Sequence, residues 1–111
     1  MFRKMIKISF LYDENAKIYG FDFLGHAEYA VKGDDIVCAA VSCLVFTTLN
    51  SIEKLTECGF TGEQNKEKGY VHFEIKKGES DEKSELLLNS LKIGVCEIQN
   101  KYGKKYINIE K

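Results

Sequence analysis

The fold is decided by the stretch DDIVCAAVSCLVFTTLNSIEKLTEC, residues 34–58, which contains the longest strongly apolar run in this chain of 111 residues. Its apolar side chains recur every three or four positions after two aspartates, which predicts a helix capped by Asp34 or Asp35 and ending near Cys58. Gly59 then suits the left-handed residue that ends many helices. Apolar residues also fill much of the other side of this helix, which indicates a central helix or one that packs against a second subunit.

Two hairpins are expected around this helix. Before it, residues 6–10 and 19–23 alternate between apolar and polar side chains on either side of the polar turn at residues 13–15. After it, residues 60–77 predict a second hairpin, with His72 on its polar, exposed face. The apolar residues expected to face inward from the second hairpin are Val71, Phe73 and Ile75.

The C-terminal third of the chain predicts one more helix and one more strand. An acidic segment opens the helix, with Ser80 or Asp81 as its cap, and Gly103 closes it. Residues 106–110 follow as a short strand. The expected order is β-β-α-β-β-α-β, which is an α+β fold with a mostly antiparallel sheet packed against two helices in one domain, residues 1–111.

Charge and composition exclude several classes of protein. The 16 basic and 17 acidic residues give a net charge of −1, which argues against direct binding of nucleic acid or of an acidic membrane surface. The strongly apolar run Ile36 to Phe46 is shorter than the roughly 20 residues that cross a bilayer. The N-terminus lacks the long apolar centre of a signal peptide, so we expect a cytoplasmic protein.

Cysteine usage indicates neither disulfides nor a metal site. The chain has four cysteines and no CxxC pair, and disulfides are rare in a reducing compartment. Cys38 and Cys43 would point about 140° apart on a helix and so would not share a metal ion. Cys43, Cys58 and Cys96 are therefore interpreted as core or boundary residues, and no metal or other cofactor is expected.

The segment GHAEYAVKGDDIVCAAVS, residues 25–42, is the candidate site of chemistry. Residues 25–34 predict a long loop, and with Asp35 as the cap Cys38 would be the third residue of the helix, where free backbone amides and the helix dipole favour a thiolate. His26 would enter the same loop from the second strand and act as general base to Cys38. The amides of Cys38 and Ala39 would then bind a developing oxyanion.

The same residues also fit an inert structure. A cysteine in an apolar helix is usually a small buried hydrophobic residue, and a histidine in a loop is usually solvated. Ser42 lies one turn after Cys38, where its hydroxyl would reach either the sulfur or a carbonyl of its own helix. From the residues alone, a reactive pair and a structural cysteine both remain open.

A resemblance favours the reactive pair. The pattern of Gly25-His26-Ala27, Gly33 and then DIVCAAVS at residues 35–42 resembles the signature of the bacterial ribosomal-processing cysteine proteases, the Prp family. That family pairs a histidine in a GHA motif with a cysteine in a DIVCA motif twelve residues later, and His26 and Cys38 have this separation.

The resemblance implies a cysteine endopeptidase of Firmicutes and related bacteria, which removes an N-terminal extension from the twenty-seventh protein of the large ribosomal subunit. It implies that Cys38 is the nucleophile and His26 the base and then the acid, with Asp35 and Ser42 in supporting positions. Gly25 and Gly33 would bracket a loop that closes on the peptide, and the enzyme would be a homodimer. The alternatives are a non-enzymatic ribosome-associated binding protein and a thiol redox sensor that uses Cys38.

Overall fold

The computed structural model describes residues 6–25, 32–65 and 69–110, and for residues 32–35 it describes the backbone. The elements follow the expected order β-β-α-β-β-α-β, which confirms the α+β fold. In chain order they are β1 (Ile6–Tyr12), β2 (Ile18–Leu24), α1 (Lys32–Leu55), β3 (Phe60–Asn65), β4 (Tyr70–Ile75), α2 (Glu82–Tyr102) and β5 (Ile107–Glu110).

The strands form one sheet in the order β3-β4-β2-β1-β5. Both predicted hairpins are present, and they join through the antiparallel pairing of β2 with β4, while β5 lies parallel to β1. The register shifts between Leu11 and Tyr12, and as a result Ile18, rather than Tyr19, enters the core beside Phe21. The sheet is thus mostly antiparallel with one parallel edge.

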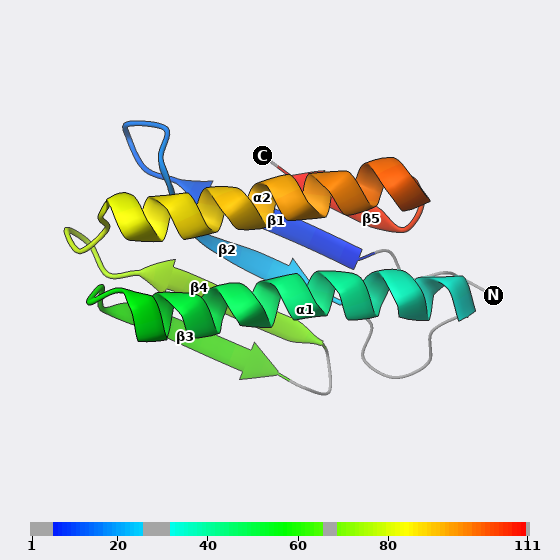
Figure 1. Ribbon diagram of the computed structural model, residues 1–111, viewed down its shortest axis with the longest axis horizontal. Coiled ribbons are helices and arrows are strands. Elements are labelled where there is room, and N and C mark those ends of the chain that lie inside the picture. The colour runs from blue at the N-terminus through cyan, green and yellow to red at the C-terminus, as the bar shows by residue number, and fades with distance from the viewer. Residues whose placement is uncertain (1–5, 26–31, 66–68, 111) are drawn as a thin grey trace.

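Both helices cover one face of this sheet and run in opposite directions (Figure 1). They pack closely where Gly94 of α2 meets α1, because a Cβ atom at this position would lie 2.8 Å from Leu44 Cδ1. α1 buries one stripe against the sheet, formed by Val37, Val41, Val45 and Ile52. The inward residues of β4, Val71, Phe73 and Ile75, are buried as predicted.

The bounds of α1 differ from the prediction at both ends. The helix begins at Lys32, so Asp34 and Asp35 occupy its first turn rather than its cap. Acidic residues are favoured at both places, and the sequence therefore does not distinguish the two starts. The helix ends at Leu55, and directly after it Thr56 Oγ1 donates to the Ile52 carbonyl at 2.6 Å and accepts from the Cys58 amide at 3.2 Å.

Gly59 does not act as the predicted left-handed cap. It precedes β3, where its amide donates to Glu79 Oε1 at 2.8 Å and its carbonyl accepts from the Lys76 amide. In α2, by contrast, Asp81 forms the predicted cap with Ser84, and Gly103 ends the helix with φ 109°. The carboxylate of Asp81 accepts from the Ser84 amide, which lowers the pKa of Asp81.

The apolar part of α1 is longer than the sequence analysis recognised. Residues Ile36–Leu55 form a 20-residue helical segment with a mean hydropathy of 1.7, so length and composition alone would allow it to cross a membrane. Contrary to the prediction, the apolar run of α1 is therefore not too short to cross a bilayer. In the structure its buried stripe packs against the sheet as a core helix does, but only 28% of the segment's most apolar window is buried.

Candidate active site

Cys38 lies on the first half of α1, half-buried against the edge of the hydrophobic core. Its neighbours Val37 and Val41 are fully buried, and they fix the rotation of the helix around the sulfur. Ser42 follows one turn later, with its Oγ 3.9 Å from Cys38 Sγ. Of the two contacts considered for this serine, the structure shows the one with the sulfur.

A small cavity of about 170 Å³ opens beside Cys38. One wall is apolar and consists of Phe23 from β2, Phe46 from α1 and Val71 from β4. The other lining residues are Gly25, Ser42, Gln64, Asn65, Gly69 and Tyr70. The sulfur therefore borders a space that has both an apolar wall and hydrogen-bonding groups.

Gly25 brings the end of β2 to the sulfur. A Cβ atom at this position would lie 3.5 Å from Cys38 Sγ and 2.9 Å from Phe23 Cζ, so the backbone of Gly25 runs directly beside the thiol. Its amide donates to the Gly69 carbonyl at 2.8 Å, which ties this point of the chain to the start of β4. Gly25 is the last described residue before position 26, and His26 follows it directly in the sequence.

Several of the other predicted site residues take positions that differ from the prediction or lie outside the described residues. His26 lies among residues 26–31, outside the described part of the chain. Gly33 and Asp35 belong to the first turn of α1 rather than to a loop and a cap. Ala39 is an exposed residue of the same helix.

The expected oxyanion hole at the helix N-terminus is not formed by Cys38 and Ala39. Counting from Lys32, Cys38 is the seventh helical residue, and only the first four amides of a helix lack an intrahelical acceptor. The influence of the helix dipole also fades within the first turn. The error follows from the position of the helix start, which lies three residues earlier than the predicted cap at Asp35.

A polar cluster that the sequence analysis missed lies on the opposite face of the sheet. His72, predicted to be exposed, is half-buried, and its Nδ1 is 2.6 Å from Asp22 Oδ1 on β2. The hydroxyl of Tyr70 donates to the same oxygen at 2.8 Å, and His72 Nε2 is 3.4 Å from Glu74 Oε2. Only the pairing of β2 with β4, which places Asp22 opposite His72, reveals this cluster.

Hydrogen bonding to Asp22 shifts two ionisations in this cluster. It raises the pKa of His72 above its ordinary 6.5, although partial burial acts in the other direction. The same carboxylate raises the pKa of Tyr70, because its hydrogen bond holds the phenol in the protonated form. Tyr70 also lines the cavity beside Cys38, whereas its hydroxyl is bonded to Asp22 on the opposite face of the sheet.

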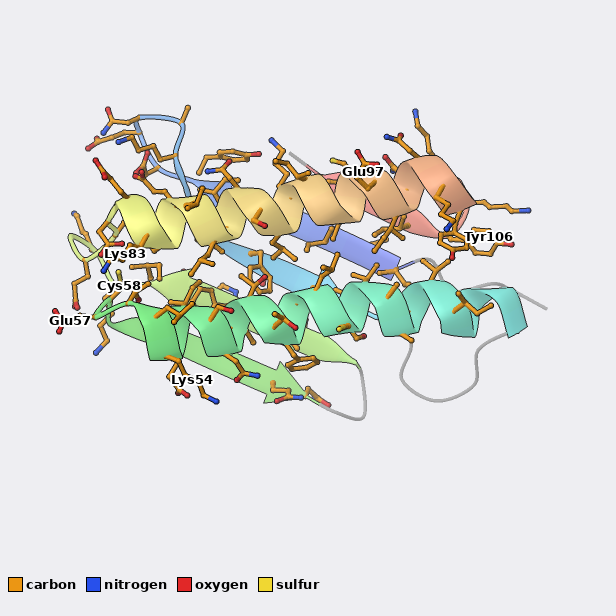
Figure 2. The ribbon with its side chains drawn as sticks, in the orientation of Figure 1. Lys54, Glu57, Cys58, Lys83, Glu97 and Tyr106 are labelled. Carbon is orange, nitrogen blue, oxygen red and sulfur yellow. The ribbon has the colours of Figure 1, made fainter. Side chains whose placement is uncertain are left out.

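The remaining cysteines lie away from this cavity. Cys58 is buried just after the end of α1, beside Asp81 and far from the start of that helix (Figure 2). Cys96 is half-buried, and Cys43 is exposed, which contradicts its interpretation as a core or boundary residue. Among the described residues, no three histidine, cysteine or acidic side chains are grouped to hold a metal ion.

A larger hollow of about 700 Å³ lies between the β1–β2 turn and the β4–α2 connection. Its described lining includes Tyr12, Lys17, Lys76 and Glu85, but no cysteine or histidine. The smaller cavity is thus the better candidate for an active site, because it holds a thiol.

The family of Prp cysteine proteases matches residues 5–108 of this chain. The chain belongs to this family. The protein is therefore a cysteine protease, and the resemblance of residues 25–42 to that family is confirmed.

Curated relatives carry the same assignment. The ribosomal processing cysteine protease Prp of Bacillus subtilis is 29% identical over 107 residues, which cover 88% of this chain and 90% of the relative. Its counterpart in Staphylococcus aureus is 26% identical over 104 residues, which cover 90% of this chain and 93% of that relative.

Solved structures share the fold. The structure of Prp from S. aureus in complex with a substrate peptide superposes with a TM-score of 0.86 at 23% identity, covering 96% of this chain and 98% of that one. The structure of SMU.848 from Streptococcus mutans superposes with a TM-score of 0.83 at 25% identity, covering 96% of this chain and 93% of that one.

Proposed function

We propose that this protease removes the N-terminal extension of the twenty-seventh protein of the large ribosomal subunit, with Cys38 as nucleophile and His26 as general base and acid. The close approach of Gly25 to Cys38 Sγ carries this assignment, because the residue after Gly25 is His26. A side chain one residue further along has the reach to form a hydrogen bond with the thiol. The names of the relatives, ribosomal processing cysteine proteases, support a substrate from the ribosome.

The reaction is acyl transfer in two steps. His26 takes the thiol proton, and the thiolate attacks the scissile carbonyl to give a tetrahedral intermediate. Its collapse breaks the C–N bond as His26 returns the proton to the departing amine. Water, deprotonated by His26, then attacks the thioester, and the acid product leaves with the thiol regenerated.

The oxyanion of the intermediate requires donors other than the amides of α1. The hydroxyl of Ser42 and the side-chain amide of Gln64 line the cavity beside the sulfur, and both groups donate hydrogen bonds. We assign these two side chains to oxyanion stabilisation. Asp35 and Gly33 belong to the first turn of α1, and we assign them supporting positions there.

The apolar wall of the cavity selects an uncharged substrate side chain next to the scissile bond. Phe23 and Val71 are buried to 3% and 5% exposure and form a fixed surface, and Phe46 is more exposed at 37%. Burying a polar side chain here without a partner would be unfavourable.

The proposed setting is a cytoplasmic homodimer. α1 exposes an apolar stripe formed by Ile36, Ala39, Cys43 and Phe46, whose spacing of three and four residues places them along one side of the helix. A second copy of the chain would cover this stripe, which borders the cavity at Phe46.

The experiment is cleavage of the full-length ribosomal protein, followed by mass spectrometry. Wild type should release the N-terminal extension, whereas Cys38→Ala and His26→Ala should reduce cleavage at least about a thousandfold because each removes a reacting group. Cys43→Ala is the matched control, since it removes an exposed thiol from the same helix and should leave cleavage unchanged.

The alternatives give other patterns. A binding protein would bind the ribosomal protein without cleaving it, and its affinity would survive both substitutions. A redox sensor would depend on Cys38 and on oxidant but would tolerate the loss of His26.

A further inference from the structure

Strand β3 is exposed to an unusual degree for part of a sheet. It forms one edge, next to β4, and all five residues from Thr61 to Asn65 are exposed, which includes side chains on both of its faces. In Figure 1 it lies along the border of the sheet on the side of α1 away from α2. Among the described residues, no strand pairs with the outer edge of β3, and much of its surface is exposed.

The sequence of β3 does little to protect this edge. Natural edge strands commonly carry lysine, proline or a bulge that prevents pairing with another chain. The segment TGEQN, residues 61–65, has neither lysine nor proline, its pairing with β4 is regular, and Glu63 is its one charged residue. Glycine also stands at position 62. The space inside the sheet does not require it, because a Cβ atom there would make an ordinary contact of 3.4 Å with the His72 carbonyl oxygen. Glycine in a strand often marks the close approach of another backbone.

The open edge is continuous with the candidate active site. Asn65 pairs with Tyr70, and Tyr70 pairs with Leu24, so the last residues of β3 lie at the same end of the sheet as Gly25. Gln64 and Asn65 line the cavity together with Cys38. A strand that pairs with β3 would therefore end beside the sulfur.

We propose that the substrate binds as an additional strand along the outer edge of β3, which guides the scissile bond to Cys38. This proposal rests on the proposed function and specifies how the same site holds its substrate. The six residues of β3 span about 20 Å, enough to pair with five or six residues of an extended peptide on one side of the scissile bond. Main-chain pairing supplies affinity and direction, and the cavity beside Cys38 supplies side-chain selection.

An extended peptide fits this edge better than a second copy of the chain. A protease must hold the residues around the scissile bond in an extended form, and the edge leads directly into the cavity that holds the thiol. A folded partner paired with β3 would instead cover that cavity. The apolar stripe of α1 lies on a different element and leaves the edge free for the substrate.

The first test is amide hydrogen exchange on the Cys38→Ala variant with a synthetic peptide that covers the N-terminal extension and cleavage site. Saturating peptide should slow exchange about tenfold or more within residues 61–65. The opposite edge strand, β5, is the internal control and should exchange at an unchanged rate.

Three outcomes would overturn the proposal. In the first, the peptide binds but exchange in β3 does not change. In the second, β3 is already protected without peptide, to a degree that rises with protein concentration, which would assign the edge to self-association. In the third, wild type does not cleave the peptide, which would overturn the proposed function as well. Cleavage by wild type without protection of β3 would leave the proposed function standing and remove only the edge.

A second test places N-methyl groups singly along the peptide backbone. Successive amides of a strand point to opposite sides, so pairing predicts that alternate positions raise KM about three- to tenfold, the loss expected for one hydrogen bond. The positions between them should change KM less than about twofold. An effect without this alternation would contradict pairing with a strand.

Discussion

Gly25 is a residue whose backbone runs directly beside the sulfur of Cys38. A Cβ atom at this position would lie 2.9 Å from Cζ of the buried Phe23 and 3.5 Å from Cys38 Sγ. A side chain would therefore require the Phe23 ring or the backbone to move. The residue is thus required by close approach rather than by its backbone dihedral angles. This requirement explains why a glycine stands directly before His26.

We expect Gly25→Ala to lower kcat/KM about ten- to a hundredfold, because the added methyl group meets the Phe23 ring at 2.9 Å, so that either this ring of the cavity wall or the backbone of Gly25 beside the thiol must move. Gly94→Ala is the matched control. It also creates a close contact, 2.8 Å from Leu44 Cδ1, but between the two helices. Steady-state kinetics at a temperature where both variants are folded, together with their melting temperatures, would separate the effects. Equal losses of activity in the two variants would contradict a special role for Gly25.

At the scale of elements, periodic patterns predicted both helices and both hairpins because the signal lies within each segment. The start of α1 was missed since Asp34 and Asp35 suit a cap and a first turn equally. The thiol was predicted from its motif, but Gln64 and Val71 were not placed in the cavity. Their position depends on the order β3-β4-β2, which no local pattern encodes.

The end of α1 provides a test of a single side chain that stops a helix. We expect Thr56→Val to lower the free energy of unfolding by about 1 kcal/mol, because it removes the hydroxyl that bonds both the Ile52 carbonyl and the Cys58 amide. Thr47→Val, at an exposed position of the same helix, should change the free energy of unfolding by less than about 0.5 kcal/mol. Urea unfolding would measure both, and equal effects would show that Thr56 does not act as a stop.

The pairing of β2 with β4 predicts a pH dependence of stability. The pKa of His72 is raised in the folded state by Asp22, so the charged imidazole stabilises the fold fully below its ordinary pKa of 6.5. This contribution disappears as the pH rises through the folded-state pKa. Glu74 beside it, and Glu63 across from it on β3, add to the negative surroundings.

We therefore expect the melting temperature of wild type to fall, relative to His72→Gln, as the pH is raised from 5.5 to 8.5 (a range of about 3 units around the reference pKa). Thermal unfolding followed by circular dichroism would give the difference at each pH. Asp22→Asn should remove the same pH dependence, because it removes the charge that raises the pKa of His72. Parallel pH profiles for all three proteins would contradict the assignment.

Across the whole molecule, apolar surface is distributed unevenly between the two helices. α1 exposes four residues in one stripe, Ile36, Ala39, Cys43 and Phe46, whereas on α2 the exposed Leu86 and Ile93 are separated by seven residues (93 − 86 = 7) with polar neighbours. Contiguous apolar surface is unfavourable in water unless a partner covers it. The stripe on α1 therefore favours a two-fold interface in which the same surface of each copy packs against the other.

The dimer is tested by placing a charge in this stripe. Ile36→Glu would bury an unpaired carboxylate in the interface, so we expect it to raise the dimer dissociation constant at least about tenfold. Ile93→Glu is the matched control, because Ile93 is similarly exposed, at 65% against 54%, but lies on α2. Light scattering after size exclusion, over a range of concentrations, would measure the mass of each protein. If wild type is monomeric, or if Ile36→Glu leaves the dimer intact, the stripe must have another role. Because Phe46 lines the cavity, that role would be contact with the substrate.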